Sequence, residues 1–214
     1  MGSDLSVVRS ARVSYDAAWR AGEDEGSDAR LIKYLWKNGH TTPFESVSFT
    51  FEVKAPIFVF RQWHRHRTQA YNELSARYKE LPEEFYVPAP DVIGQQSAKS
   101  KQAREMTGVP DNISTVIMHE AGEQAFLSYR ELLKRGVPRE LARSVLPVST
   151  YSHMFTTVSL LNLMKFIALR DHEHAQWEIR QYAQAMRTLA ETVAPVSIAA
   201  GFPLVVQQVT DAEE

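Results

Sequence analysis

The residues with the greatest potential for chemistry lie together in the segment 61–78. Its eighteen positions hold four arginines and two histidines, interleaved with aromatic side chains, and the apolar segment 57–60 directly precedes it. Charges of one sign cannot pair among themselves, and guanidinium groups match phosphate and planar acceptors in bidentate geometry. The segment therefore predicts a site for a phosphorylated, planar ligand. A solvated, charged helix face is the alternative explanation.

Two other groups suggest a different chemistry, and their surroundings support neither. Ser75 is a candidate nucleophile, but no residue near it in sequence is an obvious general base, and an unactivated serine is weak. We therefore expect Ser75 to form hydrogen bonds only. His172, Glu173 and His174 are consecutive, so on a helix they point to different sides, which suits a single metal ion poorly. We predict no metal site.

The remaining candidates are isolated in the sequence. Arg143, Arg170 and His174 are single residues in helical patterns, and taken alone each is better explained as a surface or salt-bridge group. The segment 40–45 follows Gly39 and, taken alone, is typical of a turn. Glycine-rich phosphate loops and the Gly-x-Ser-x-Gly elbow are absent from the sequence. A nucleotide cofactor would have to bind without those motifs.

The composition sets limits on the class of protein. With 214 residues the chain has the size of one domain, and we assign 1–214 to a single domain. The net charge of -2 provides no general basic field for nucleic acid. The lack of cysteine excludes thiol nucleophiles and thiolate metal sites, and it suits a reducing cytoplasm. We find no secretory signal and no membrane span, because Gly201 and Pro203 interrupt the apolar run 196–206. We expect a cytoplasmic protein.

A strand and a helix are expected to position the cationic segment. Residues 46–54 alternate between apolar and polar side chains, the pattern of a half-buried strand. The apolar face carries Val47, Phe49, Phe51 and Val53. Pro56 ends this strand and can open a helix at its first position. Continued through the cationic segment, that helix places Arg61 and Arg65 on one face, with His66 and Arg67 pointing elsewhere.

Helical patterns dominate the rest of the chain. Asp28 is expected to cap a helix that Gly39 ends, and Pro138 to open a short helix that Pro147 ends. Longer helices are predicted over 114–136, 156–169 and 175–193, the last closed by Pro195. The core-facing stripe expected in the first of these comprises Ile117, Ala121, Ala125, Tyr129 and Leu132. Loops are predicted at 72–76 and 94–108, and a brief strand at 85–90. These elements predict one α+β domain.

A spaced signature runs through the cationic segment: Arg65-His66-Arg67, seven residues, then Ser75. This signature and its surroundings resemble the flavin-dependent thymidylate synthases. Further blocks similar to that family lie at 11–15, 42–45, 55–59, 72–78, 140–147 and 169–180. The blocks follow the family's order, and an ordered set is far more specific than the signature alone.

The resemblance implies a fold, an assembly and a reaction. The fold is a central, mostly antiparallel sheet flanked by helices, and the assembly is a homotetramer whose active sites are built from several subunits. The implied enzyme methylates dUMP reductively at C5, giving dTMP and tetrahydrofolate. FAD, reduced by NADPH, is the implied cofactor, and methylenetetrahydrofolate is the carbon donor. The absence of cysteine fits, because the unrelated classical thymidylate synthases need a cysteine nucleophile.

Matching positions also imply the residues of the site. The dUMP-binding residues would be Gln62, Arg65, Glu73, Ser75, Arg77, Arg143 and Arg170. The FAD-binding residues would be Ser14, His40, Thr42, Glu45, Arg65, His66, Arg67, Asn72, Glu73 and His174. Arg170, the implied catalytic residue, would lie against the uracil and favour ionisation at N3, which makes C5 more nucleophilic. The flavin would carry the hydride.

Three positions depart from the family pattern. Ser159, Leu161 and Lys165 stand where polar or basic residues of other types are common, on the segment that borders the flavin in the family. They put FAD affinity or flavin placement in question. A strand that usually precedes the first block is expected to be missing, which leaves one edge of the sheet undefined.

Two alternative functions stay open. A related enzyme could methylate UMP or another pyrimidine nucleotide in specialised metabolism, and the altered segment 159–165 keeps this alternative open. A non-catalytic nucleotide-binding or RNA-binding homologue is the remote alternative. It would need the arginine cluster but not Arg170, His174 or the segment 40–45, and the chain has all three.

Overall fold

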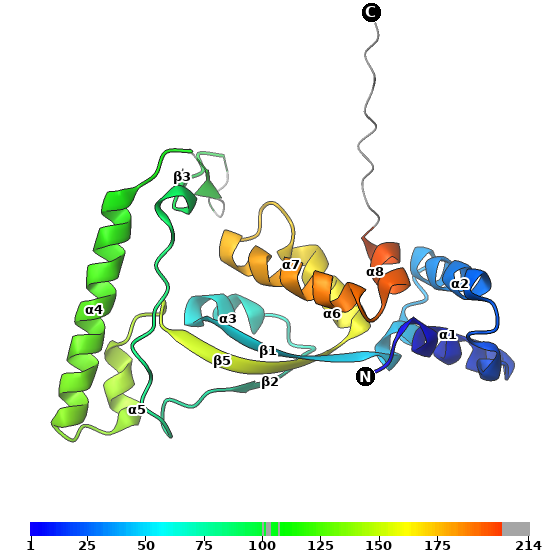
Figure 1. Ribbon diagram of the computed structural model, residues 1–214, viewed down its shortest axis with the longest axis horizontal. Coiled ribbons are helices and arrows are strands. Elements are labelled where there is room, and N and C mark those ends of the chain that lie inside the picture. Colours follow the sequence, from blue (N-terminus) through cyan, green and yellow to red (C-terminus); the bar gives the residue numbers. More distant parts are fainter. Residues whose placement is uncertain (100, 102–103, 107, 203–214) are drawn as a thin grey trace, which may run out of the picture. The chain divides into compact units, whose positions relative to one another are not determined.

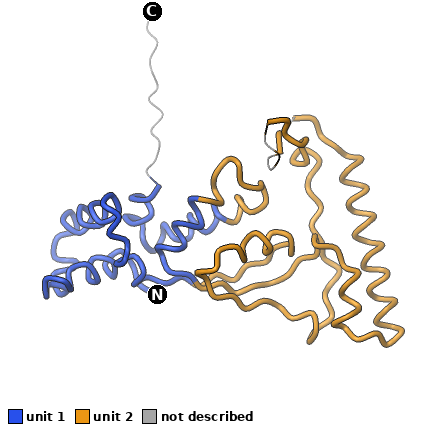
Figure 2. The backbone as a smooth tube through the Cα atoms, turned by 180° about the vertical axis from the view of Figure 1, so that it is seen from behind, with its two compact units in different colours: residues 1–49, 158–168, 183–214 blue, residues 50–157, 169–182 orange. Residues whose placement is uncertain are grey.

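A computed structural model describes residues 1–99, 101, 104–106 and 108–202. The backbone forms two compact units, coloured blue and orange in Figure 2. Unit 1 comprises residues 1–49, 158–168 and the chain from residue 183 onward, and unit 2 comprises residues 50–157 and 169–182. Neither unit is a single continuous segment, so the chain passes between them four times.

A three-stranded sheet forms the centre of unit 2 (Figure 1). Its order is β1 (Ser48–Pro56), β5 (Tyr151–Ser159) and β2 (Ala70–Glu73), and β2 pairs antiparallel with β5. The strand predicted at 46–54 is confirmed as β1, with Phe49 and Val53 buried and the alternate residues exposed. The small sheet with its flanking helices confirms the α+β class.

The prediction of a helix from residue 156 is wrong for its first residues. Tyr151–Ser159 is a strand with alternating burial, in which Met154, Thr156 and Val158 face inward. Residues of β-branched type favour the pleated, paired conformation, and pairing with β2 outweighs the helical pattern that follows. The helix α6 begins only at Leu160 and ends at Arg170.

The helix expected to run through the cationic segment is shorter than predicted. Helix α3 (Ile57–Trp63) has Pro56 as its N-cap, whereas Pro56 was predicted at the first helical position. His64 is the C-cap. The Tyr71 hydroxyl donates to the carbonyls of Trp63 (3.1 Å) and His66 (2.7 Å), which satisfies groups that a helix end leaves without partners. Arg65 therefore lies in a turn, not one helical turn from Arg61. Part of the loop predicted at 72–76 belongs to β2.

A long helix and a hairpin complete unit 2. Helix α4 (Asn112–Lys134) packs on α5 (Arg139–Ala142) through Phe126 and Tyr129. The short helix predicted between Pro138 and Pro147 is α5 followed by the 3-10 helix η5 (Arg143–Val145). The stripe predicted for α4 is partly wrong, because Ile117 is 60% exposed and Gly122 takes the buried position. The Phe85 ring lies where a Cβ on Gly122 would be, only 2.3 Å away, so a larger residue would displace it.

The segments on either side of that ring also differ from the sequence-based expectations. Phe85 forms one isolated bridge with Thr150 instead of the brief strand predicted at 85–90. The segment 94–108 contains a hairpin, β3 (Gln95–Gln96) with β4 (Arg104–Glu105), where a loop was predicted; residues 100, 102, 103 and 107 lie outside the described residues.

Unit 1 is helical. It contains α1 (Asp4–Arg12), α2 (Glu25–Lys37), η3 (Thr42–Ser46), α8 (Pro195–Gly201), most of α6 and the later part of α7 (Trp177–Glu191). Asp4 accepts hydrogen bonds from the backbone amides of Val196 (2.8 Å) and Ser197 (2.9 Å), and these bonds tie the first helix to the last. Pro195, which was predicted to close the helix over 175–193, is also the first residue of α8.

The start of α2 corrects the predicted cap. Asp24, not Asp28, is the N-cap, and its side chain accepts the Ser27 amide at 2.9 Å. Asp28 lies within the helix and is buried, where it forms an ion pair with Arg12 (2.6 Å) and accepts the Gly22 amide (2.7 Å). The helix ends as predicted, since Gly39 has a φ of +70° that glycine adopts without strain. Among the described residues, no helix combines the length and apolarity that crossing a bilayer requires.

Candidate active site

Arg170 is the centre of a hydrogen-bonded cluster in unit 2. Its Nε donates to His66 Nε2 at 2.9 Å, its Nη2 donates to the Gln62 carbonyl at 3.0 Å, and its Nη1 donates to Gln62 Oε1 at 3.3 Å. Gln62 comes from α3, His66 from the turn after it, and Arg170 from the end of α6. Three contacts on one planar guanidinium fix its orientation.

His66 is neutral in this arrangement. Arg170 can only donate, so Nε2 of His66 must present a lone pair, which assigns the ring proton to Nδ1. Burial, and secondly the nearby Arg170 cation, lower the pKa of His66 from 6.5 to about 4. Burial, and secondly the Arg65 cation, also lower the pKa of Arg170. Arginine stays charged at any physiological pH, so the cluster presents a half-buried cation.

Gln176 extends the cluster. Gln62 Nε2 donates to Gln176 Oε1, while Gln62 Oε1 receives the bond from Arg170. Gln176 directly precedes α7, and its carbonyl accepts the Arg180 amide at 3.2 Å. A continuous chain of polar contacts therefore runs from α7 through α3 to the end of α6.

Two of the arginines predicted to bind dUMP, Arg77 and Arg143, lie together at a second place in unit 2. Arg77 forms an ion pair with Glu140 (3.1 Å), and Arg143 Nε donates to the Glu140 carbonyl at 3.3 Å. Both arginines border a surface hollow together with Pro138 and Leu141. An ion pair this exposed contributes little to stability, so an incoming anion can displace Glu140 at small cost.

The other predicted residues of unit 2 are placed around the strand β2. Glu73 accepts a hydrogen bond from Ser152 at 2.8 Å, and Ser75 Oγ accepts the Arg77 amide at 3.3 Å. Arg65, Arg67 and Asn72 are exposed. His174 is also exposed, and its contacts are with its neighbours Glu173 and His172. The structure thus joins Gln62, His66 and Arg170 directly, and it gives His174 no contact with them among the described residues.

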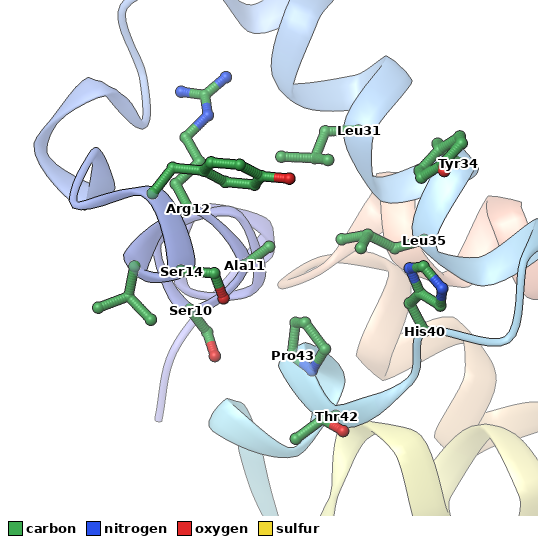
Figure 3. A pocket seen from close by; sticks show the side chains of 12 residues that line it. Ser10, Ala11, Arg12, Ser14, Leu31, Tyr34, Leu35, His40, Thr42 and Pro43 are labelled. Carbon is green, nitrogen blue, oxygen red and sulfur yellow. The ribbon is translucent and has the colours of Figure 1, made fainter.

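A pocket of about 670 Å³ in unit 1 gathers three of the predicted flavin residues (Figure 3). Three of its lining residues are Ser14, from the short 3-10 helix η1 (Val13–Tyr15), His40, from the turn after α2, and Thr42, from η3. The other lining residues are mainly apolar: Ala11, Val13, Leu31, Leu35 and Pro43, with Ser10, Arg12, Tyr15 and Tyr34. The turn at Gly39 directs His40 toward the pocket, because the His40 amide returns to the Leu35 carbonyl at 2.9 Å. Glu45 is exposed and is not among the lining residues.

Comparison with known proteins identifies the family. The model of the thymidylate synthase complementing protein family matches residues 1–196. The chain is 47% identical over 195 residues to a flavin-dependent thymidylate synthase of Thermotoga neapolitana, covering 91% of this chain and 84% of the relative. The chain belongs to the flavin-dependent thymidylate synthase family.

Other members of this family and a solved structure agree. A flavin-dependent thymidylate synthase of Treponema denticola is 46% identical over 202 residues, covering 93% of this chain and 75% of the relative. The crystal structure of the UMP/dUMP methylase PolB from Streptomyces cacaoi with 5-Br dUMP matches with a TM-score of 0.83 at 39% identity. That match covers 93% of this chain and 90% of PolB.

The three departures from the flavin-dependent thymidylate synthase pattern have local structural roles. Ser159 precedes α6, and its Oγ accepts a hydrogen bond from Asn162 Nδ2 at 3.1 Å. Leu161 is buried in the core of unit 1, and Lys165 is exposed. Leu161 therefore contributes apolar packing where a polar residue would be costly. The effect of these residues on a flavin stays a prediction.

Sequence reasoning missed two parts of the site. Leu31, Tyr34 and Leu35 line the pocket, and their spacing of three and four residues is the signal that they share one helix face. Gln176 was missed because it is uncharged and does not belong to any spaced motif of reactive or charged residues. It lies inside a block that resembles the family, and a half-buried polar contact of this kind becomes visible only in three dimensions.

Proposed function

We propose that this protein is a flavin-dependent thymidylate synthase that methylates dUMP at C5 reductively to dTMP. Methylenetetrahydrofolate is the carbon donor, and FAD reduced by NADPH is the cofactor. The observation that carries the proposal is Arg170, a cation held in one orientation by Gln62 and His66, in a chain of this family. The family relationship supports an enzyme that uses a flavin.

Arg170 is proposed to activate the uracil. Its three contacts use three of the five N–H bonds of the guanidinium, so two remain for a planar acceptor. A cation fixed beside a uracil carbonyl stabilises the charge that develops when N3 loses its proton, and this charge makes C5 more nucleophilic. Because the donors are held before substrate binds, little reorganisation is needed during reaction.

The dUMP site is proposed to combine this cation with the second arginine group. Arg77 and Arg143 border one hollow and are suited to the phosphate, with Arg65 as a further exposed cation. Gln62, Glu73 and Ser75 are proposed to hold the base and sugar through hydrogen bonds. The proposed dUMP set is therefore Gln62, Arg65, Glu73, Ser75, Arg77, Arg143 and Arg170.

The flavin site is proposed to include the pocket of unit 1. Its volume lies within the range of small-molecule sites, and an apolar lining with a few polar groups is the usual chemistry of such sites. When bound, reduced flavin supplies the hydride that completes the methyl group. The proposed residues are Ser14, His40, Thr42, Glu45, Arg65, His66, Arg67, Asn72, Glu73 and His174. We also propose that the two units form one catalytic domain and that the chain assembles as a cytoplasmic homotetramer with shared active sites.

One measurement tests this function against its alternative. PolB, which matches closely in structure, is a UMP/dUMP methylase and was solved with 5-Br dUMP and with 5-Br UMP, so UMP is the second candidate substrate. The reduced, FAD-loaded protein is offered equal dUMP and UMP with methylenetetrahydrofolate, and the products are weighed by mass spectrometry. We expect dUMP to gain one methylene unit. Methylation mainly of UMP would favour the alternative. No product, from a protein that in its oxidised state retains no yellow flavin, would favour the non-catalytic homologue.

A further inference from the structure

The direction of the hydrogen bonds in the Arg170 cluster follows from the chemistry of its members. A guanidinium has donors and no acceptor, whereas a glutamine amide has one of each kind. Gln62 must therefore turn Oε1 toward Arg170, which turns its Nε2 donor away from Arg170. The group that receives this donor is Oε1 of Gln176. An acceptor at position 176 therefore matches the orientation of Gln62 that Arg170 needs.

Gln176 is itself held in place. It precedes Trp177, the first residue of α7, and Glu178 in the first turn is buried. Glu178 Oε1 accepts hydrogen bonds from Arg104 (3.0 Å) and from the Tyr86 hydroxyl (3.2 Å). The Arg104 guanidinium also lies 6.0 Å from the ring centre of Trp177. These contacts anchor the start of the helix, and so they limit how far Gln176 can move.

We infer that Gln176 is a positioning residue: it fixes the amide of Gln62 and, through that amide, the guanidinium of Arg170. Without an acceptor at this position, the Gln62 amide can rotate by half a turn. Its NH2 group would then face the N–H groups of Arg170, donor against donor, and one of the three contacts on the guanidinium would be lost. For its effect on rate, this inference rests on the proposed function.

Three substitutions at one position separate this role from simple packing. Gln176→Glu keeps an acceptor, Gln176→Leu removes both donor and acceptor at similar size, and Gln176→Lys offers only donors. Gln181→Leu is the matched control, because Gln181 is an exposed glutamine of α7, the helix that Gln176 directly precedes. A packing role predicts that leucine, nearest in shape and uncharged, is tolerated at least as well as glutamate.

Rate is the first readout. We expect kcat to fall about tenfold in Gln176→Leu and further in Gln176→Lys, since one hydrogen bond to a charged group is lost. We expect a change of less than about threefold in Gln176→Glu and in Gln181→Leu. KM for dUMP should move less than kcat, because Arg170 is proposed to act on the developing charge. Equal kcat values for the glutamate and leucine variants would overturn the inference.

Ionisation of bound 5-fluoro-dUMP is the second readout and needs no turnover. Loss of the N3 proton changes the ultraviolet absorbance of a uracil, so its apparent pKa on the FAD-loaded protein follows from difference spectra. We expect Gln176→Leu and Gln176→Lys to raise that pKa toward the value for free nucleotide, and Gln176→Glu to leave it near wild type. If the apparent pKa values of the variants follow this order but the wild-type protein methylates nothing, the proposed function alone would be refuted. A wild-type protein that methylates dUMP while all variants share one pKa would refute the inference alone.

Discussion

The pocket of unit 1 and the Arg170 cluster of unit 2 are built on opposite principles. The pocket is a space of about 670 Å³ whose exposed lining is mainly apolar, and Ser14, His40 and Thr42 are among its polar groups. The Arg170 cluster consists of polar groups that are hydrogen-bonded to one another and hold the guanidinium in one orientation. The first region can recognise a ligand by shape, and the second by a charge held in a fixed direction.

This difference predicts two kinds of mutational effect. Substitutions in the pocket remove contact area and isolated hydrogen bonds, so they should change how tightly a ligand binds. Substitutions in the Arg170 cluster alter the direction of a cation, so they should change the rate more than the binding.

The largest effect is expected for Arg170→Ala. Loss of a fixed cation beside the uracil should lower kcat by about 10²–10³-fold, the usual cost of removing a group that stabilises developing charge. Flavin absorbance per protein should stay at the wild-type level, because the pocket of unit 1 is untouched. Steady-state kinetics and a visible spectrum measure both. Undiminished turnover would refute the proposed role of Arg170.

A smaller effect of the other kind is expected for His40→Ala. The imidazole of His40 lines the pocket, with its ring 6.1 Å from that of Tyr34 in an edge-on arrangement. Its removal should weaken FAD binding about tenfold, as the loss of packing and one polar contact together would. Affinity for dUMP should be unchanged, by calorimetry.

His119→Ala is the control for His40→Ala, because His119 is an exposed histidine of α4 whose contacts among the described residues are with Glu123 and the Phe85 ring. If His40→Ala instead lowered kcat at saturating flavin, the contrast between binding in the pocket and rate in the Arg170 cluster would fail.

Local sequence patterns predicted the elements but not all of their limits. The alternation of 46–54 and the punctuation at Gly39 and Pro138 are local signals, and β1, the end of α2 and the start of α5 agree with them. The end of α3 depends in part on Tyr71, whose hydroxyl adds a second donor to the Trp63 carbonyl beside the His66 amide. The strand β5 depends on pairing with β2. Neither dependence can be derived from local periodicity.

The site shows the same limit. Similarity to the family brought Gln62, His66 and Arg170 into one list, but only the fold shows that they bond to one another. The sequence suggested a helix that would have turned His66 away from Arg65. The turn after Trp63 instead gives His66 a carbonyl that bonds to Tyr71 and a ring that bonds to Arg170. Gln176 joined the site only because α7 begins beside α3.

A still smaller effect, on the pH dependence of the free energy of unfolding, is expected for His66→Gln. Glutamine retains an acceptor for Arg170. The pKa of His66 is about 4 in the folded protein and 6.5 in the unfolded chain, so between these values the unfolded chain binds more protons. Wild-type stability should therefore fall as pH falls from 6.5 toward 4, whereas His66→Gln lacks this contribution. The difference should be on the order of 1 kcal/mol, because solvent screens a half-buried ring.

Urea unfolding of both proteins at pH 7 and near pH 4 measures the His66 effect. Parallel stability curves for wild type and His66→Gln would show that burial and Arg170 do not hold His66 neutral. The direction of bonding at the centre of the Arg170 cluster would then be wrong, and with it the fixed cation on which the contrast depends.

The smallest effect is expected for Ser75→Ala. Ser75 Oγ accepts the backbone amide of Arg77 at 3.3 Å, and the structure places no histidine, lysine or carboxylate in a hydrogen bond with it among the described residues. An unactivated serine is a poor nucleophile, so we expect a loss of less than about tenfold in kcat/KM for dUMP, from one hydrogen bond. Steady-state kinetics with the purified variant measures it. A complete loss of product with dUMP still bound would make Ser75 part of the chemistry, and unit 2 would then act through a covalent or proton-transfer step as well as through the direction of a charge.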